Sequence, residues 1–151
     1  MAIIMEHYLK SEHPLQQLLQ DAGVLAEKTL HDPLGDAHTL PVLDLRSCCP
    51  AEWEDYQRQL TEQGVAYIDA EGKVCKRPMT AQEVEELPYW PVEFLPDGEL
   101  LWKSRNQIFE YPAYLISKRW PQLALQLQIY CEADLMAEQE VRNGEFSDLD
   151  V

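Results

Sequence analysis

The sequence predicts an α+β protein in which helices cover one face of an antiparallel sheet in a ferredoxin-like arrangement, preceded by an N-terminal helical segment. Residues 123–130 alternate between apolar and polar side chains, which is typical of a strand with one buried face. Two units of strand, helix and strand, over residues 40–68 and 99–130, follow each other along the chain. The length of 151 residues, with 46% hydrophobic residues, suits one domain with a sizeable core.

We expect three parts along the chain. Residues 1–39 form an N-terminal helical extension packed on the domain, residues 40–146 form a single α+β domain, and residues 147–151 form an acidic tail. Apolar residues at helical spacing predict the extension, and Gly35 and the Asp32-Pro33 pair predict a loop at its end. The spaced residues are Leu15, Leu18, Leu19, Ala22, Leu25 and Leu30.

The first unit begins with a short apolar strand over residues 40–45. A helix follows from Pro50, which suits the first helical position, to Gly64, which suits the residue after the last turn. Residues 65–68 are the next strand, and Gly72 turns the chain into a hairpin with residues 73–76.

The second unit is preceded by a short helix that opens with the capping box Thr80-Ala-Gln-Glu83 and ends at Pro88. Residues 89–94 are extended, and residues 96–98 turn into a strand over 99–103. A helix over 111–120 ends at Pro121. After the alternating strand, residues 137–141 pair with it and end at Asn143-Gly144.

The net charge of the chain indicates which classes of partner it can bind. The chain has 27 Asp and Glu against 12 Lys and Arg, a formal net charge of −15. Nucleic acids and anionic membranes bind cationic surfaces, so we expect no direct nucleic acid and no membrane as ligand. A basic protein partner fits this charge better.

The cysteines and the first residues of the chain indicate the cellular compartment of the protein. No two of the four cysteines have the C-x-x-C spacing, and the first residues lack the basic segment and long apolar stretch of a signal peptide. We therefore expect reduced thiols in a cytoplasmic protein.

The candidate binding residues are four acids and two aromatics. Residues 132–151 contain seven acids against Arg142 alone, and the acids on or beside the predicted strands offer charge to a basic partner. Two neighbouring aromatics in a proline-bounded segment offer interface anchors. The predicted site consists of Glu132, Asp134, Glu138, Glu140, Tyr89 and Trp90.

Other groups favour ordinary structural roles. Four histidines (His7, His13, His31 and His38) lie in the first 38 residues, with Asp32 and Asp36 near the last two, but their spacing favours a solvated loop over a metal site. Cys48 and Cys49 precede a helix whose first turns are acidic, which favours packing over reactivity. The sequence has no nucleophile-elbow, phosphate-loop, dinucleotide or zinc-finger motif, so we expect no cofactor and no metal.

The C-terminal block from Trp102 to Gly144 resembles the YubB-type ferredoxin-like domain of plasmid and phage proteins. The resemblance is carried by Trp120-Pro121 at the end of the helix, by Tyr130-Cys131-Glu132 at the end of the alternating strand, and by Asn143-Gly144. It implies a ferredoxin-like fold and a mobile-element setting, and it brings no established chemistry.

Three classes of function stay open at this point. The first is a small acidic protein-binding module, either an immunity or antitoxin-like protein or a DNA-mimicking counter-defence protein. The second is a ligand-binding domain or enzyme with a pocket formed by Trp53, Trp102 or Trp120. The third is an assembly subunit, for example a homodimer, that associates through a free sheet edge. The charge favours the first.

Overall fold

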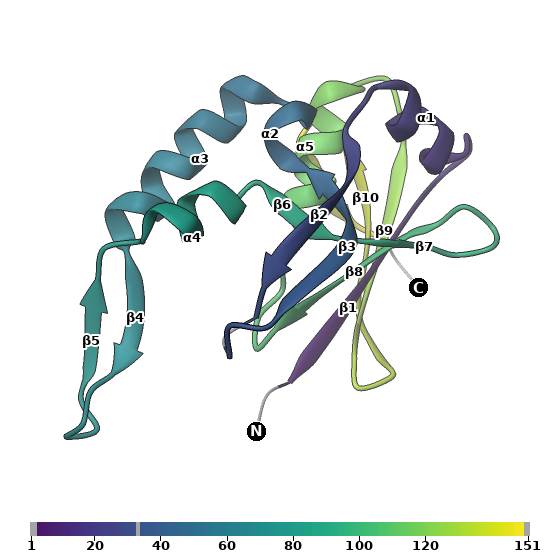
Figure 1. Cartoon of the computed structure of the whole chain (residues 1–151). Coiled ribbons are helices and arrows are strands. Elements are labelled where there is room, and N and C mark those ends of the chain that lie inside the picture. The colour runs from purple at the N-terminus through teal and green to yellow at the C-terminus, as the bar shows by residue number, and fades with distance from the viewer. Residues whose placement is uncertain (1–2, 33, 150–151) are drawn as a thin grey trace.

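Three antiparallel sheets and five helices make up the part of the chain that the computed structural model describes, residues 3–32 and 34–149 (Figure 1). In chain order the elements are β1 (Ile4–Ser11), α1 (Leu15–Asp21), β2 (Leu25–His31), β3 (Ala37–Asp44), α2 (Leu45–Cys48), α3 (Pro50–Gln63), β4 (Val65–Ile68), β5 (Val74–Arg77), α4 (Ala81–Glu86), β6 (Tyr89–Pro91), β7 (Glu93–Phe94), β8 (Leu100–Arg105), α5 (Tyr111–Arg119), β9 (Leu125–Cys131), β10 (Asp134–Arg142) and β11 (Glu145–Asp148).

The largest sheet has six strands in the order β11-β10-β9-β1-β8-β7, and each neighbouring pair is antiparallel. A second sheet has the order β2-β3-β6, and β4 and β5 form a separate hairpin that stands away from the other sheets (Figure 1). The predicted α+β class with antiparallel sheets is confirmed.

The core lies between one face of the large sheet and the helices. The predicted alternation of β9 is confirmed, because Leu125, Leu127 and Ile129 are buried while the side chains between them face the other way. Leucines of α1 and α2, Trp53 of α3 and the inner face of α5 complete the same cluster. Burying this apolar surface supplies most of the driving force for folding.

The other face of the large sheet carries no helix among the described residues and is mostly polar. In the register of the strands, Gln128 lies opposite both Tyr8 and Glu138, and Gln126 lies opposite both Lys10 and Glu140. We call this the open face of the sheet.

Several predicted elements occur where the sequence places them. Helix α3 begins at Pro50, and Gly64 follows it with φ 72°, a backbone conformation that favours glycine. Strand β4 covers residues 65–68, and both hydrogen bonds of the capping box between Thr80 and Glu83 are present at the start of α4.

The prediction of a helical extension over residues 1–39 is wrong. Only residues 15–21 are helical, residues 25–31 form β2, and β1 pairs with β8 on one side and β9 on the other. Gly23, with φ 72°, interrupts the helical spacing of the leucines. The buried residues of β1 are His7 and Leu9, and because histidine is polar the strand lacks a clear apolar alternation.

The predicted units of strand, helix and strand also need correction. Strand β4 pairs with β5 alone and does not join the sheet of β3, so residues 40–68 are not such a unit. Strands β8 and β9 do flank α5 within one sheet, but β1 lies between them. The predicted tail starts inside β11, which pairs Asp148 with Gln139, and residues 150–151 lie outside the described part.

His7 connects the middle of the sheet to the segment before α5. Its Nδ1 donates to the Trp102 carbonyl at 3.2 Å, and its Nε2 accepts from the Phe109 N–H at 3.0 Å. The ring also stacks on Trp102 at 5.2 Å. Burial lowers the pKa of His7 to about 4, so the imidazole is neutral at pH 7, as both hydrogen bonds require.

This lowered pKa predicts a pH dependence of stability. Between pH 6.5 and about 4 the unfolded chain binds a proton at His7 that the folded chain does not, so the free energy of unfolding falls as the pH falls through this window. Urea unfolding at several pH values measures this slope. In His7→Gln the slope should be smaller, and an unchanged slope would contradict the assignment.

Candidate functional site

Acids and tyrosines gather in an open hollow of about 620 Å³ where α3, the start of α5 and the β10–β11 hairpin meet. Helix α3 contributes one wall, the segment from residue 110 to 114 contributes the second, and the hairpin contributes the third. We call it the acid–tyrosine pocket. Its lining residues are Glu52, Asp55, Tyr56, Gln59, Glu110, Tyr111, Tyr114, Gln139 and Phe146.

The wall from α3 follows from the period of the helix. Glu52, Asp55, Tyr56 and Gln59 are three, four and seven positions apart, so they share one face. Trp53 points away from this face into the core, and its indole N–H donates to Gln57 Oε1 at 2.8 Å. The buried tryptophan therefore fixes the rotation of the helix that presents the acids.

Three tyrosines stack beside these acids. The rings of Tyr56 and Tyr111 lie 3.9 Å apart with an interplanar angle of 23°, and the rings of Tyr111 and Tyr114 lie 5.7 Å apart at 14°. Burial raises the pKa of each of the three phenols, so they stay neutral hydroxyls at pH 7. The stack is a neutral aromatic wall next to a row of carboxylates.

The hydroxyls of the stack hold Glu52 in position. Tyr114 donates to Glu52 Oε2 at 3.1 Å, and Tyr111 donates to the backbone carbonyl of Glu52, also at 3.1 Å. Lys118 Nζ lies 4.0 Å from Glu52 Oε1 at the rim. These contacts join α3 to α5 across the pocket.

Glu110 carries a charge that its surroundings disfavour. Burial raises the pKa of this half-buried carboxyl, and the negative charge of Asp148 on β11 raises it further. Within the described residues Glu110 makes no ion pair, whereas Asp55 pairs with Arg58 at 2.8 Å on the exposed surface. A cation entering the pocket would relieve this repulsion.

Gln139 adds an acceptor without a donor. Its Nε2 donates to Asp148 Oδ1 at 3.1 Å, but its buried Oε1 meets no hydrogen-bond donor among the described residues. A buried acceptor without a partner costs about 1–3 kcal/mol. The pocket thus offers carboxylates and aromatic faces, and a positively charged ligand complements both.

The four predicted acids lie outside this pocket. Glu132 is in the β9–β10 turn with φ 50°, and Asp134 begins β10 beside it. Glu138 and Glu140 point to the open face, because side chains alternate along a strand and Gln139 between them faces the pocket. The structure brings Glu138 and Glu140 together on one face and places Glu132 and Asp134 at the tip of the hairpin.

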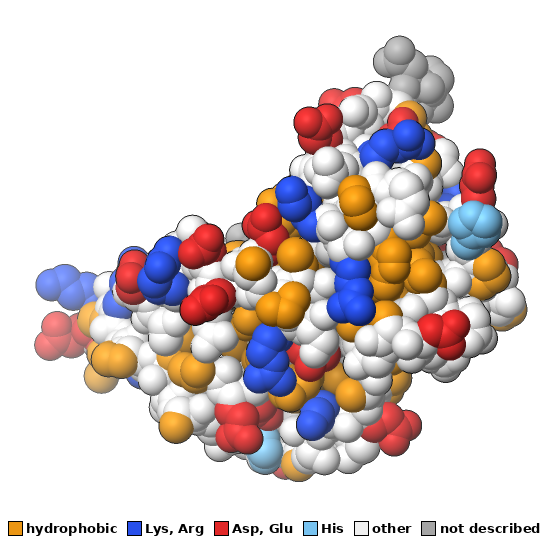
Figure 2. Space-filling view, turned by 90° about the horizontal axis from the view of Figure 1, so that it is seen from above, with side chains coloured by type: hydrophobic (Ala, Val, Ile, Leu, Met, Phe, Trp, Pro, Cys, Tyr) orange, Lys and Arg blue, Asp and Glu red, His pale blue; other side chains and the backbone are white. Residues whose placement is uncertain are grey.

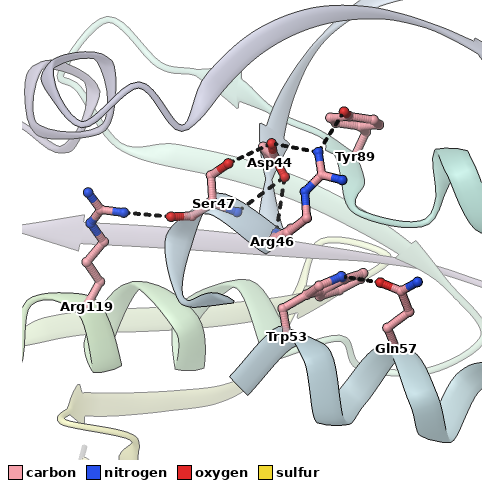
Figure 3. A network of polar contacts seen from close by, with 7 residues as sticks. All are labelled: Asp44, Arg46, Ser47, Trp53, Gln57, Tyr89 and Arg119. Carbon is pink, nitrogen blue, oxygen red and sulfur yellow. Dashed lines mark hydrogen bonds and ion pairs between the residues drawn. The ribbon is translucent and has the colours of Figure 1, made fainter. Parts of the chain in front are cut away.

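The two predicted aromatic anchors lie on β6, in the second sheet. The Tyr89 hydroxyl accepts from Arg46 at 3.1 Å, in a network where Asp44 caps α2 and Arg119 donates to the Ser47 carbonyl (Figure 3). This gives Tyr89 a structural contact. Trp90 is half-buried, 4.2 Å from the ring of Phe109, and lines a separate apolar groove.

The groups expected to be structural have structural contacts. His31 contacts Glu86 at 3.0 Å and His38 contacts Asp32 at 2.9 Å. In residues 3–32 and 34–149, no three His, Cys, Asp or Glu side chains gather as a metal site would require. Cys48 is buried, and burial raises the pKa of its thiol to about 12, which keeps it protonated.

The sequence contained a signal for the pocket that single residues do not show. The spacing of Glu52, Asp55 and Tyr56 places the three side chains on one face of α3. These residues meet Glu110 and Tyr111 because α3 packs against α5. The contacting residues Glu52 and Tyr111 are 59 positions apart in the sequence.

Comparisons of the chain with family models, with curated proteins and with solved structures give no match in any of the three. The resemblance of residues 102–144 to the YubB-type domain stays a prediction.

The repulsion between Glu110 and Asp148 predicts a coupled titration. In Asp148→Asn the pKa of Glu110 should fall toward its ordinary value, because one of the two causes of its elevation is removed while burial stays. This pKa is measured by following the NMR signal of the Glu110 side-chain carboxyl carbon as the pH is changed. Asp134→Asn, the same change at the far hairpin, is the control and should leave the Glu110 pKa unchanged; equal effects would contradict the assigned contact.

Proposed function

We propose that this protein is a protein-binding module whose acid–tyrosine pocket accepts a lysine or arginine side chain of a basic partner. The observation that carries the proposal is the convergence of Glu52, Asp55 and Glu110 on the stacked pair Tyr56 and Tyr111. Carboxylates beside tyrosine rings are the surroundings in which a cationic side chain is bound by charge and by cation–π attraction together.

The energies favour a cation over other ligands. A cation over an aromatic ring contributes about 0.5–2 kcal/mol, more when water is excluded, and a charged hydrogen bond about 1.5–3 kcal/mol. Glu110 without an ion pair is a cost in the free protein that a guanidinium or ammonium group would offset. An anionic ligand would instead add to the repulsion between Glu110 and Asp148.

The shape of the pocket favours a side chain presented by a protein. The hollow is open to solvent and is walled by Tyr56, Tyr111, Tyr114 and Phe146, and aromatic residues of this kind are enriched in protein interfaces. The helix α3 continues past the pocket with exposed polar side chains, which suit the rim of an interface.

The acids outside the pocket support the encounter with such a partner. The net charge of −15 creates a field that attracts a basic protein from a distance, and Glu132, Asp134, Glu138 and Glu140 contribute to it. In this proposal these four residues act on the rate of association, and the pocket supplies the specific contact.

We further propose a setting for this function. The strand order β9-β1-β8-β7 with antiparallel pairs, and α1 and α5 as the two helices, supports a ferredoxin-like arrangement that is extended by β10 and β11.

The free thiols of Cys48, Cys49, Cys75 and Cys131 suit the cytoplasm. No described helix is long and apolar enough to cross a membrane. An immunity or antitoxin-like role and a counter-defence role differ in the partner, a cognate toxin or a nucleic-acid-binding complex.

Affinity capture from a lysate with two double variants tests the proposal. Asp55→Asn with Glu110→Gln removes two charges from the pocket, and Glu138→Gln with Glu140→Gln removes the same two charges from the open face. We expect the pocket variant to weaken binding of a captured basic protein at least about tenfold, and the open-face variant less than about fivefold.

The equal change in net charge makes the comparison specific. If both variants weakened binding equally, the partner would respond to overall charge and the pocket would have no special role. If only the open-face variant weakened it, the predicted acids Glu138 and Glu140 would be the site. Isothermal titration with the captured protein then measures the affinity of each variant.

A further inference from the structure

The β4–β5 hairpin, residues 65–77, forms an arm with a firmly held base. Gly64 connects it to α3, and a Cβ at this residue would collide with the carbonyl oxygen of Arg77. Arg77 forms two hydrogen bonds to Glu83 of α4, at 2.7 and 3.0 Å, and Glu83 also belongs to the capping box of that helix. The arm therefore leaves α3 in a defined direction.

The far half of the arm carries an uncovered apolar pair. Ile68 and Val74 lie directly opposite each other across the hairpin and are 71% and 74% exposed. The arm stands apart from the body in Figure 1, and apolar side chains are visible at the left end of Figure 2, where the arm lies. A two-stranded hairpin by itself is only marginally stable in water, and a contact that buries its apolar pair would stabilise it.

An apolar groove with a free strand edge lies on the body. It has a volume of about 810 Å³ and runs between β3 and β6 on one side and β8 on the other. Its walls include Leu40, Trp90, Val92 and Leu101. Strand β7 pairs with β8 only at Leu100 and Leu101, so the outer edge of residues 102–105 has no partner strand in the described chain.

Two acids of the arm are opposite in charge to two cations of the groove. Lys103 and Arg105 lie along the groove, and within the described residues neither forms an ion pair. The acids Asp69 and Glu71 lie at the tip of the arm, directly after β4. Strand β4 itself carries no charge, whereas β5 carries Lys76 and Arg77, which would repel the two cations of the groove.

We propose that the arm of one copy docks in the groove of a second copy of this chain, with β4 adding to the free edge of β8. Main-chain hydrogen bonds would extend the six-stranded sheet, and Ile68 and Val74 would be buried against the apolar walls. Arm and groove are on the same chain, so two copies exchange arms reciprocally around a twofold axis, and the assembly closes as a dimer.

A second copy of this chain is the occupant that supplies both halves of this match. The acids Asp69 and Glu71 and the cations Lys103 and Arg105 are on the same chain, so each copy brings an arm for the groove of the other. The acid–tyrosine pocket is lined by other residues, so the dimer and the proposed function are tested separately.

Sedimentation equilibrium of the full chain and three single variants tests this proposal. Ile68→Asp changes the arm, Lys103→Glu changes the groove, and Leu34→Asp, at an 88% exposed apolar residue in the loop between β2 and β3, is the control. We expect a dimer whose dissociation constant rises at least about tenfold in each of the first two variants and is unchanged in the control.

Mixing the two weakened variants distinguishes arm exchange from other dimers. A mixed dimer of Ile68→Asp and Lys103→Glu keeps one unchanged arm in one unchanged groove, so it should form more tightly than either variant alone. A chain that is monomeric at all concentrations would overturn the proposal. A dimer that Lys103→Glu leaves unchanged, or a mixture without recovery, would also overturn it and point to contacts between arms or to another surface.

Discussion

Phe109 is held by both of its backbone polar groups, and much of the molecule depends on these two hydrogen bonds. Its N–H donates to His7 at 3.0 Å, and its carbonyl accepts from the Trp102 indole at 2.8 Å. His7 and Trp102 face each other on β1 and β8, in the middle of the large sheet. The next two residues are Glu110 and Tyr111, so the rigid centre of the sheet sets the position of the pocket.

The net charge of −15 has different consequences in different places. In the pocket, packing of α3 against α5 brings acids together and leaves Glu110 with a raised pKa. On the open face, the register pairs Glu138 and Glu140 with glutamines of β9, where water screens them. The view in Figure 2 shows Lys and Arg side chains among apolar ones, so the surface is not uniformly acidic. Position and burial therefore decide what each charge does.

The sequence predicted elements that local patterns determine and missed what depends on distant contacts. Pro50, Gly64, the capping box at Thr80 and the alternation of β9 each act within a few residues, and all four appear as expected. The place of β1 between β8 and β9 depends on residues about 95 positions away, as in the contact of His7 with Trp102, and no local pattern encodes it. The pocket was missed for the same reason, since its walls come from three distant segments.

The most direct test of the central claim is an NMR titration of the protein with N-acetyl-arginine amide as the cationic side chain. If the pocket binds a cation, the ring signals of Tyr56 and Tyr111 should shift and the pKa of Glu110 should fall, because a bound positive charge favours the carboxylate. Shifts confined to the open face around Glu138 and Glu140, or a Glu110 pKa that does not move, would contradict the account.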